Sequence, residues 1–130
     1  MIDKLALLHI KNKKLLVAVE KGKNIFYMPG GKRKIGESDI QALSREIKEE
    51  LSVDILPETI KYYRTFKAQA HGKPIGTEVK MTCYTGEFKG VPNPSGEIEN
   101  LLWIASEDIK QATPMGRLVL ASLKQETLID

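Results

Sequence analysis

The chain is poor in cysteine and lacks a long apolar segment. Cys83 is the only cysteine among 130 residues, so an internal disulfide framework is excluded and a reducing compartment is expected. The apolar part of the N-terminus, MIDKLALLHIKNKK, is too short and too interrupted by polar residues for a signal peptide or a membrane span. Repeats and low-complexity segments are also absent. We therefore expect a cytoplasmic protein with no membrane partner.

Composition and charge favour one small domain that handles a small anionic molecule. Hydrophobic residues make up 42% of the sequence, enough for a sizeable core in a single domain covering residues 1–130. Residues 1–34 contain nine lysines or arginines and two acids, whereas residues 35–58 contain seven acids and two bases. The lysines occur mainly in turns without interleaved aromatics, so no nucleic-acid polymer is expected as a partner. Basic residues near an acidic segment fit the attraction of a small polyphosphate better.

Hydrophobic patterning predicts a protein rich in short strands. Apolar or β-branched runs predict strands at residues 5–10, 15–20, 25–28, 53–56, 60–70, 77–88 and 101–104. The last of these is expected to be buried and contains Trp103, and Cys83 is expected in the core. A short helix is predicted to begin at residues 106–108. Thr113 as N-cap and Pro114 at the first helical position open a final helix with an apolar stripe of Met115, Leu118, Val119 and Leu123, plus Ser122.

A longer helix is predicted to begin near Asp39. Ser38 and Gln41 form a capping-box pair, in which the hydroxyl and the amide each satisfy a backbone group at the helix start. Residues at spacings of three and four form an apolar stripe: Ile40, Leu43, Ile47 and Leu51. A second face beside that stripe carries three carboxylates, Glu46, Glu49 and Glu50, with the small Ala42 one turn earlier.

Three carboxylates on one helix face repel one another, so a compensating partner is expected. A hard divalent cation such as Mg²⁺ suits them, because it takes oxygen ligands and retains waters beside phosphate oxygens. A solvated acidic helix face is the simpler alternative for an isolated EIKEE string. The neighbouring residues bear on this choice: Gly30 and Gly31 allow a sharp turn and close approach of a ligand, and Glu37 and Arg45 lie between this pair and the carboxylates.

Taken with their spacing, six residues closely resemble the Nudix box, the signature of hydrolases that cleave nucleoside diphosphates linked to another group: Gly31, Glu37, Arg45, Glu46, Glu49 and Glu50. Ser52 stands where the box usually has a glycine that shapes the exit from the helix, and Lys34 stands where many members have a carboxylate. Serine is a common turn residue, so the first departure concerns only the exit geometry. The second is treated as variation.

The resemblance implies an α/β/α sandwich with a mixed β-sheet between helices. It also implies that Glu46, Glu49, Glu50 and the carbonyl of Gly31 bind Mg²⁺ or Mn²⁺, and that Arg45 pairs with Glu37 to brace the loop against the helix. An arginine suits this task because its planar fork binds a carboxylate through two hydrogen bonds. An ion pair between Arg45 and Glu49, one helical turn apart, is an alternative that is compatible with it.

The general base has several candidates. In members of the family it is a box glutamate, here Glu49 or Glu50, or a carboxylate from a later loop, here Glu97 or Glu99. The last two are two residues apart, so in an extended segment they would point the same way. The alternative for each is an ordinary surface acid. His71 lies in a turn between strands and is expected to be a surface residue.

The expected reaction is magnesium-dependent hydrolysis of a phosphoanhydride bond in a small nucleotide, with a nucleoside triphosphate giving monophosphate and pyrophosphate as the first candidate. ADP-ribose or dinucleoside polyphosphate hydrolysis and non-catalytic nucleotide sensing remain alternatives, and both a monomer and a homodimer are compatible with the sequence. Substrate contacts are expected from aromatic residues over the sheet and from a loop near the C-terminus: Phe26, Tyr27, Tyr62, Phe66, Tyr84 and residues 113–117.

Overall fold

A computed structural model describes all residues, 1–130. Its main strands are β1 (Ile2–Leu8), β3 (Lys14–Glu20), β7 (Lys61–Gln69), β8 (Glu78–Thr85) and β10 (Ile98–Ile104). Shorter strands are β2 (Ile10–Lys11), β4 (Phe26–Tyr27), β5 (Gly30–Gly31), β6 (Asp54–Ile55) and β9 (Phe88–Lys89). The α-helices are α1 (Asp39–Leu51) and α2 (Pro114–Gln125). Two short 3₁₀ helices span Pro57–Thr59 and Ser106–Gln111.

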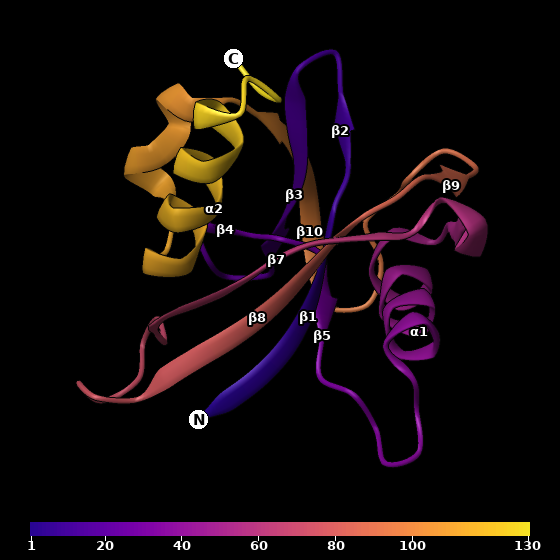
Figure 1. Ribbon diagram of the computed structural model, residues 1–130, viewed down its shortest axis with the longest axis horizontal. Helices are drawn as coiled ribbons and strands as arrows, with labels where there is room; N and C mark the ends of the chain where they lie inside the picture. Colours follow the sequence, from indigo (N-terminus) through magenta and orange to yellow (C-terminus); the bar gives the residue numbers. More distant parts are fainter.

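The strands form a mixed sheet and a second, smaller sheet. The mixed sheet has the order β5-β1-β8-β7, in which β1 and β8 are parallel and the other pairs are antiparallel. In the second sheet, ordered β10-β3-β2, strand β4 also pairs with β3. A two-stranded ribbon joins β6 and β9. Figure 1 shows α1 and α2 on opposite sides of the strands, so the expected α/β/α sandwich with a mixed sheet is confirmed.

Alternate residues of β1 point into two cores. Leu5 and Leu7 pack with the buried face of α1, while Ala6 and Leu8 pack with α2. This is the period-two alternation of a strand covered on both faces. The apolar sequence of this strand therefore fits a sheet that is covered on both faces.

Helix α1 begins as predicted, but its buried stripe differs by one position. Both capping-box hydrogen bonds are present: Gln41 N donates to Ser38 Oγ at 3.2 Å and Ser38 N donates to Gln41 Oε1 at 2.9 Å. The prediction that Ile40 faces the core is wrong, because its side chain is 42% exposed. The small Ala42 is fully buried in its place and belongs to the core cluster that α1 forms with Leu5 and Leu7 of β1.

Two other burial predictions are also wrong. In α2, Leu118 is 42% exposed, and Gly116 and Leu120 complete the buried face with Met115, Val119, Ser122 and Leu123. Trp103 is 41% exposed because β10 is an edge strand, paired only with β3. Cys83 is fully buried, as predicted.

Strand ends differ more than strand positions. The segment expected as one strand to residue 88 ends at Thr85, and the chain then crosses to pair with β6 through β9. The KNKK hairpin is confirmed, with Asn12 and Lys13 both at positive φ (53° and 61°), as a two-residue type I′ turn requires. None of the helices combines the length and the apolar character needed to cross a membrane.

Candidate active site

The glycine pair lies where the chain leaves the mixed sheet for α1. Gly30 and Gly31 pair with Ala6 and Leu5 at the edge of β1. Gly30 has φ +151°, and a Cβ there would lie 2.0 Å from the carbonyl oxygen of Leu5. A Cβ on Gly31 would lie 2.5 Å from the carboxylate carbon of Glu46. Both positions require glycine, the first for the fold and the second to admit the Glu46 carboxylate.

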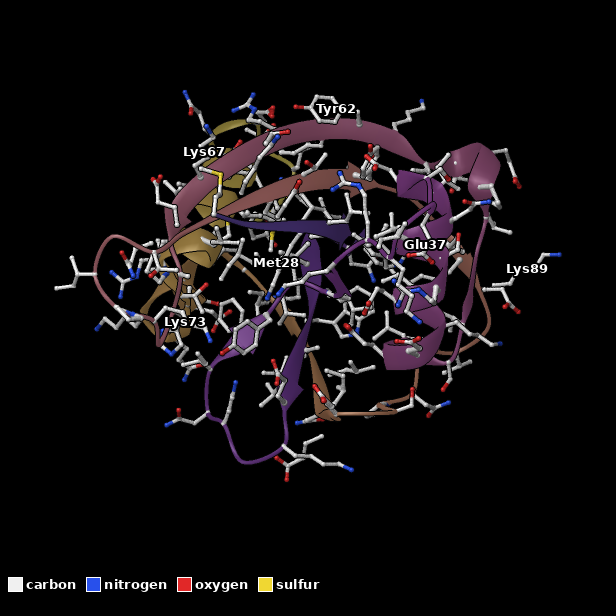
Figure 2. The ribbon with its side chains drawn as sticks, turned by 90° about the horizontal axis from the view of Figure 1, so that it is seen from below. Met28, Glu37, Tyr62, Lys67, Lys73 and Lys89 are labelled. Atoms are coloured by element: carbon white, nitrogen blue, oxygen red, sulfur yellow. The ribbon has the colours of Figure 1, made fainter.

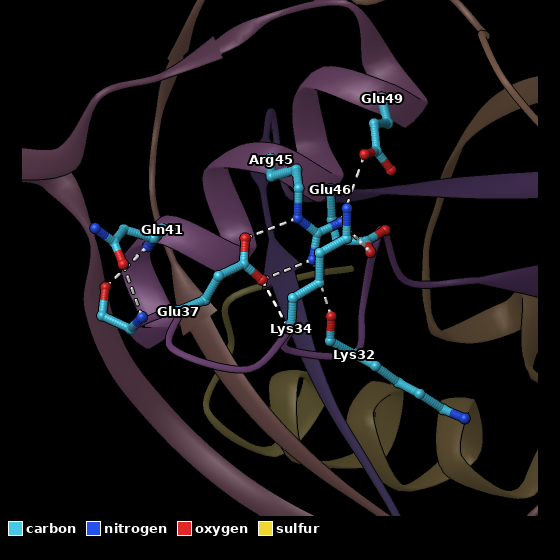
Figure 3. A network of polar contacts seen from close by, with 8 residues as sticks. Lys32, Lys34, Glu37, Gln41, Arg45, Glu46 and Glu49 are labelled. Carbon is cyan, nitrogen blue, oxygen red and sulfur yellow. Dashed lines mark hydrogen bonds and ion pairs between the residues drawn. The ribbon is translucent and has the colours of Figure 1, made fainter.

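Arg45 is the centre of the polar network drawn in Figure 3. Its Nε and Nη2 donate to the two oxygens of Glu37 at 2.8 and 2.9 Å, and Nη2 also donates to the Lys32 carbonyl at 3.0 Å. Its Nη1 donates to Glu46 at 2.8 Å and to Glu49 at 3.5 Å. The loop after the glycine pair is thereby tied to the carboxylate face of α1, and the two expected pairings of Arg45 coexist.

Charge complementarity in this network fixes the protonation of Glu37. The Arg45 guanidinium, assisted by the backbone N–H of Lys34, lowers the pKa of Glu37 to about 2. Its partners Glu37 and Glu46 in turn raise the pKa of Arg45. Glu37 therefore remains an anion throughout the neutral range and serves as a fixed anchor for the arginine.

Glu50 has the opposite environment. Burial is the main reason that its pKa is raised to about 8, and the negative charges of Glu46, Glu20 and Glu49 add to the rise. The hydrogen bond that Gly30 N donates to Glu50 at 3.2 Å lowers the pKa in part. A carboxyl group with this pKa is largely protonated at neutral pH unless a cation offsets its neighbours. A bound cation would favour the ionised form of Glu50, because it would offset the neighbouring negative charges.

The donor set fits a hard divalent ion that keeps part of its water shell. Glu46, Glu49 and Glu50 line one cavity together with Gly31. No three acidic, histidine or cysteine side chains are positioned to coordinate one ion. Instead, Glu46 and Glu49 accept hydrogen bonds from Arg45, and Glu50 accepts one from Gly30 N. Mg²⁺ needs no such cage, since one or two carboxylates with waters and substrate phosphates complete its octahedron. Carboxylate and carbonyl oxygens are also the ligands that Mg²⁺ and Mn²⁺ prefer.

The loop that carries Glu97 is fastened to the C-terminal end of α1. Ser52 ends the helix in the left-handed conformation (φ 57°), where the box usually has glycine, and its hydroxyl donates to Ser95 Oγ at 3.1 Å. The Ser95 hydroxyl in turn donates to the backbone carbonyl of Glu49, and the Ser95 backbone N–H donates to the backbone carbonyl of Glu50 at 3.0 Å. The exit geometry is thus preserved with serine, and the loop satisfies carbonyls that the helix end leaves free.

The structure brings Glu97 to the cavity but not Glu99. Glu97 lines the cavity beside Gly96, whereas Glu99 lies at a bulge in β10, between Ile98 and Asn100 in the pairing with β3. A bulge interrupts the alternation of side chains, on which the expectation that both carboxylates point the same way depended.

The cavity has a volume of about 510 Å³, and it extends from α1 to the turn between β7 and β8. In Figure 2, Met28 lies between Glu37, on the α1 side, and Lys73, in that turn. Tyr27, Thr113 and Met115 line it, as the sequence suggested, while the other aromatic candidates do not: Phe26, Tyr62, Phe66 and Tyr84. Phe26 is buried in the core, and Tyr84 donates a hydrogen bond to Asp39.

Sequence reasoning missed several groups at the site. Glu20, Lys4 and Lys73 line the cavity, and so does His71, which is exposed as expected. Arg33 also braces the loop by pairing with Asp39 of α1 and, at 3.2 Å, with Asp3 of β1. Glu20, Lys4, His71 and Lys73 come from segments that are far apart in the sequence, so no local motif indicates that they line one cavity.

Comparison with solved structures places this fold among Nudix hydrolases. The MutT NUDIX hydrolase from Burkholderia pseudomallei superposes with a TM-score of 0.77 at 22% identity, over 92% of this chain and 95% of that one. The E. coli dihydroneopterin triphosphate pyrophosphohydrolase gives 0.73 at 15% identity, over 95% of each chain. A bifunctional NMN adenylyltransferase/ADP-ribose pyrophosphatase from Francisella tularensis, complexed with AMP and a manganese ion, gives 0.70 at 18%, over 97% of this chain and 42% of that one.

The family model described as NUDIX domain matches residues 5–123, which is nearly the whole chain. The chain therefore belongs to the Nudix family and is a hydrolase. No curated protein matches it.

Proposed function

We propose that this chain hydrolyses a phosphoanhydride bond in a nucleoside diphosphate linked to another group, with Mg²⁺ or Mn²⁺ as cofactor. The observation that carries the proposal is the convergence in one cavity of Gly31, the three helix carboxylates and Glu97. Such a set would supply the oxygen ligands that a hard divalent cation takes, together with a carboxylate from a separate loop.

Each residue has a distinct task in the proposed reaction. Bound by Glu46, Glu49, Glu50 and the Gly31 carbonyl, the divalent ion would neutralise charge on the phosphate oxygens and lower the pKa of a bound water. Arg45 holds Glu46 and Glu49 in place and is itself held by Glu37. This arrangement fixes the carboxylates before substrate arrives, which limits the reorganisation that the reaction requires.

Glu97 is the preferred candidate for the general base. It lies on a separate loop and lines the cavity without a salt-bridge partner, so its carboxylate is free to accept a proton from the attacking water. Glu49 is the next candidate, because its side chain is 54% exposed and its contact with Arg45 is long, at 3.5 Å. Glu99 lies outside the cavity and is the natural negative control.

A nucleoside triphosphate, cleaved to monophosphate and pyrophosphate, is the first substrate to assay. The neighbour from E. coli is named as a triphosphate pyrophosphohydrolase, and the one from F. tularensis as an ADP-ribose pyrophosphatase in one of its two activities. Nucleoside triphosphates, ADP-ribose and dinucleoside polyphosphates therefore belong on the same panel.

The test is hydrolysis across that panel with and without Mg²⁺, for the wild type, Glu50→Gln, Glu97→Gln and Glu99→Gln. We expect metal-dependent turnover of one class, lost in the Glu50 variant, reduced at least a hundredfold in the Glu97 variant and unchanged in the Glu99 variant. A folded wild type that binds these nucleotides but cleaves none would replace the hydrolase proposal with a nucleotide-sensing role.

A further inference from the structure

The two ends of the cavity differ in charge. The end at α1 carries Glu46, Glu49 and Glu50, and Glu97 is fastened beside it through Ser95. The other end is formed by the turn between β7 and β8, which contributes His71 and Lys73. Figure 1 and Figure 2 both show this turn on the far side of the strands from α1.

A third basic residue of the cavity lining, Lys4, comes from β1. It pairs in register with Met81 of β8, which in turn pairs with Phe66 of β7, so Lys4 lies on the face of the sheet that α2 covers. Lys4 is half-buried, and neither its ammonium group nor that of Lys73 has a carboxylate within 4.0 Å. The cavity holds five glutamates, yet the ammonium group of the half-buried Lys4 has no carboxylate partner. It is therefore able to bind an anionic group of a ligand.

The turn holds its basic residues in a defined conformation. The Gln69 amide donates to the carbonyls of Ala70, Lys73 and Pro74 at 3.2, 3.3 and 3.0 Å, and its oxygen accepts from Gly76 N at 3.0 Å. All of these contacts are internal to the turn. Gln69 therefore positions the turn, and the N–H groups of its amide are used within the turn.

The cavity is poorly equipped to identify a nucleobase by hydrogen bonds. Its lining contains no asparagine, and its only glutamine is Gln69. Between the carboxylates and the turn the lining is mainly apolar, with Met28, Val79, Met81 and Met115. A sugar and base can lie against such a surface, to which Tyr27 and Thr113 add hydroxyl groups. We therefore look for the basis of substrate selectivity in the basic residues at the β7–β8 end of the cavity.

We propose that Lys4, His71 and Lys73 form a second anion site, which binds a phosphoryl group of the substrate separated from the cleaved diphosphate by the ribose. The inference rests on the proposed function, because it assumes that α1 holds the diphosphate. It narrows the substrate class to nucleotides with a further phosphate on a ribose 2′ or 3′ position. A phosphate there can accept hydrogen bonds from two lysine ammonium groups and the His71 imidazole, which line the cavity on other elements than α1.

The test uses two matched pairs of compounds that differ by one phosphate. NADH and NADPH differ at a ribose 2′ position, and dephospho-coenzyme A and coenzyme A differ at a ribose 3′ position, while all four contain a diphosphate. We expect kcat/KM to be about tenfold higher for the phosphorylated member of one pair, mainly through KM. Lys4→Gln and Lys73→Gln should each remove most of that preference, through a rise in KM that is larger for the phosphorylated member of the pair.

Lys67→Gln is the matched control, because Lys67 is an exposed lysine of the same hairpin that does not line the cavity. It should leave both members of each pair unaffected. Equal cleavage of both members in both pairs, or equal losses for both members in the lysine variants, would overturn the second site and leave the hydrolase proposal standing.

A result that contradicts the proposed hydrolase function differs from one that contradicts only the second anion site. If no compound on either panel is cleaved, the hydrolase proposal is contradicted, and calorimetric binding of the same pairs to the wild type decides the inference separately. A Kd ratio near one in both pairs rejects the second site, whereas a tenfold preference that Lys73→Gln removes supports it.

Discussion

The guanidinium of Arg45 binds the carboxylate of Glu37 at two points, from Nε to Oε2 at 2.8 Å and from Nη2 to Oε1 at 2.9 Å. The same guanidinium reaches Glu46 through its remaining nitrogen, Nη1, at 2.8 Å. One side chain thereby sets both the loop that follows the glycine pair and a proposed metal ligand. A lysine in its place would supply charge without the planar fork that makes these contacts simultaneously.

We accordingly expect Arg45→Lys to fold normally and to lose about a hundredfold in kcat/KM, a loss of close to 3 kcal/mol in transition-state stabilisation. Steady-state kinetics on the substrate found in the panel measures the loss, and circular dichroism checks the fold. Arg64→Lys is the matched control, since Arg64 lies on β7 and pairs with Glu126 at 3.6 Å, away from the carboxylates. A comparable loss in the control would indicate a general effect of the substitution.

The two glycines should respond differently to alanine. Gly31→Ala directs its methyl group at the end of the flexible Glu46 side chain, so the fold should persist while Glu46 is displaced and activity falls by at least tenfold. Gly30→Ala meets backbone atoms of Leu5 and Ala6, at 2.0 and 2.8 Å, and should lower the free energy of unfolding by about 3 kcal/mol.

Thermal unfolding and kinetics on both variants separate these effects. Gly22→Ala provides the control for positive φ alone, because Gly22 has φ +77° and nothing within 4 Å of an added Cβ. It should cost about 1 kcal/mol and leave activity unchanged. Equal stability losses in Gly30→Ala and Gly22→Ala would show that the contact with β1 is easily relieved.

Glu50 should make the metal-free protein less stable as the pH rises. Its pKa is raised from 4.5 to about 8 in the folded state, so between these values the folded chain retains a proton that the unfolded chain has released. The stabilising contribution is present below about pH 4.5 and is lost as the pH rises through about 8, in total on the order of a few kcal/mol.

Glu50→Gln removes this titration while keeping the oxygen that accepts from Gly30. Urea unfolding of both proteins in chelator at pH 6, 7, 8 and 9 should show the variant becoming the more stable of the two with increasing pH. Parallel pH profiles would mean that Glu50 titrates normally in the folded chain. Added Mg²⁺ should restore the stability of the wild type and leave that of the variant nearly unchanged.

The buried stripe of α1 provides a stability test within one helix. Ile47 is fully buried, so Ile47→Ala should lower the free energy of unfolding by about 3 kcal/mol and the Tm by about 10 °C. Ile40 is 42% exposed, so Ile40→Ala should change stability by less than about 1 kcal/mol. Differential scanning calorimetry measures both. A large effect at Ile40 would instead mean that the first turn of α1 buries this side chain in solution.

Local sequence was sufficient where the cause of a structure is local. The capping box of α1, the Thr113 cap of α2 and the hairpin turn at Asn12 depend on neighbouring residues, and each is present as expected. The pairing of Arg45 with Glu37 followed from the spacing of the box, although that spacing carries information only through its resemblance to a family. Burial was less predictable: Ile40, Leu118 and Trp103 are apolar residues whose exposure depends on which neighbouring element covers them.

The sequence by itself determined the helix that carries the carboxylates, because periodicity and capping act within a few residues. The class of fold and the loop that Arg45 braces followed from the resemblance of the box to a family. Tertiary structure alone decided that Glu97 reaches the cavity and Glu99 does not, since a bulge in β10 depends on its pairing with β3. It also decided that Lys4 and Lys73, 69 positions apart in the chain, line one cavity, because β1 pairs with β8 in parallel and the turn before β8 lies at that end of the sheet.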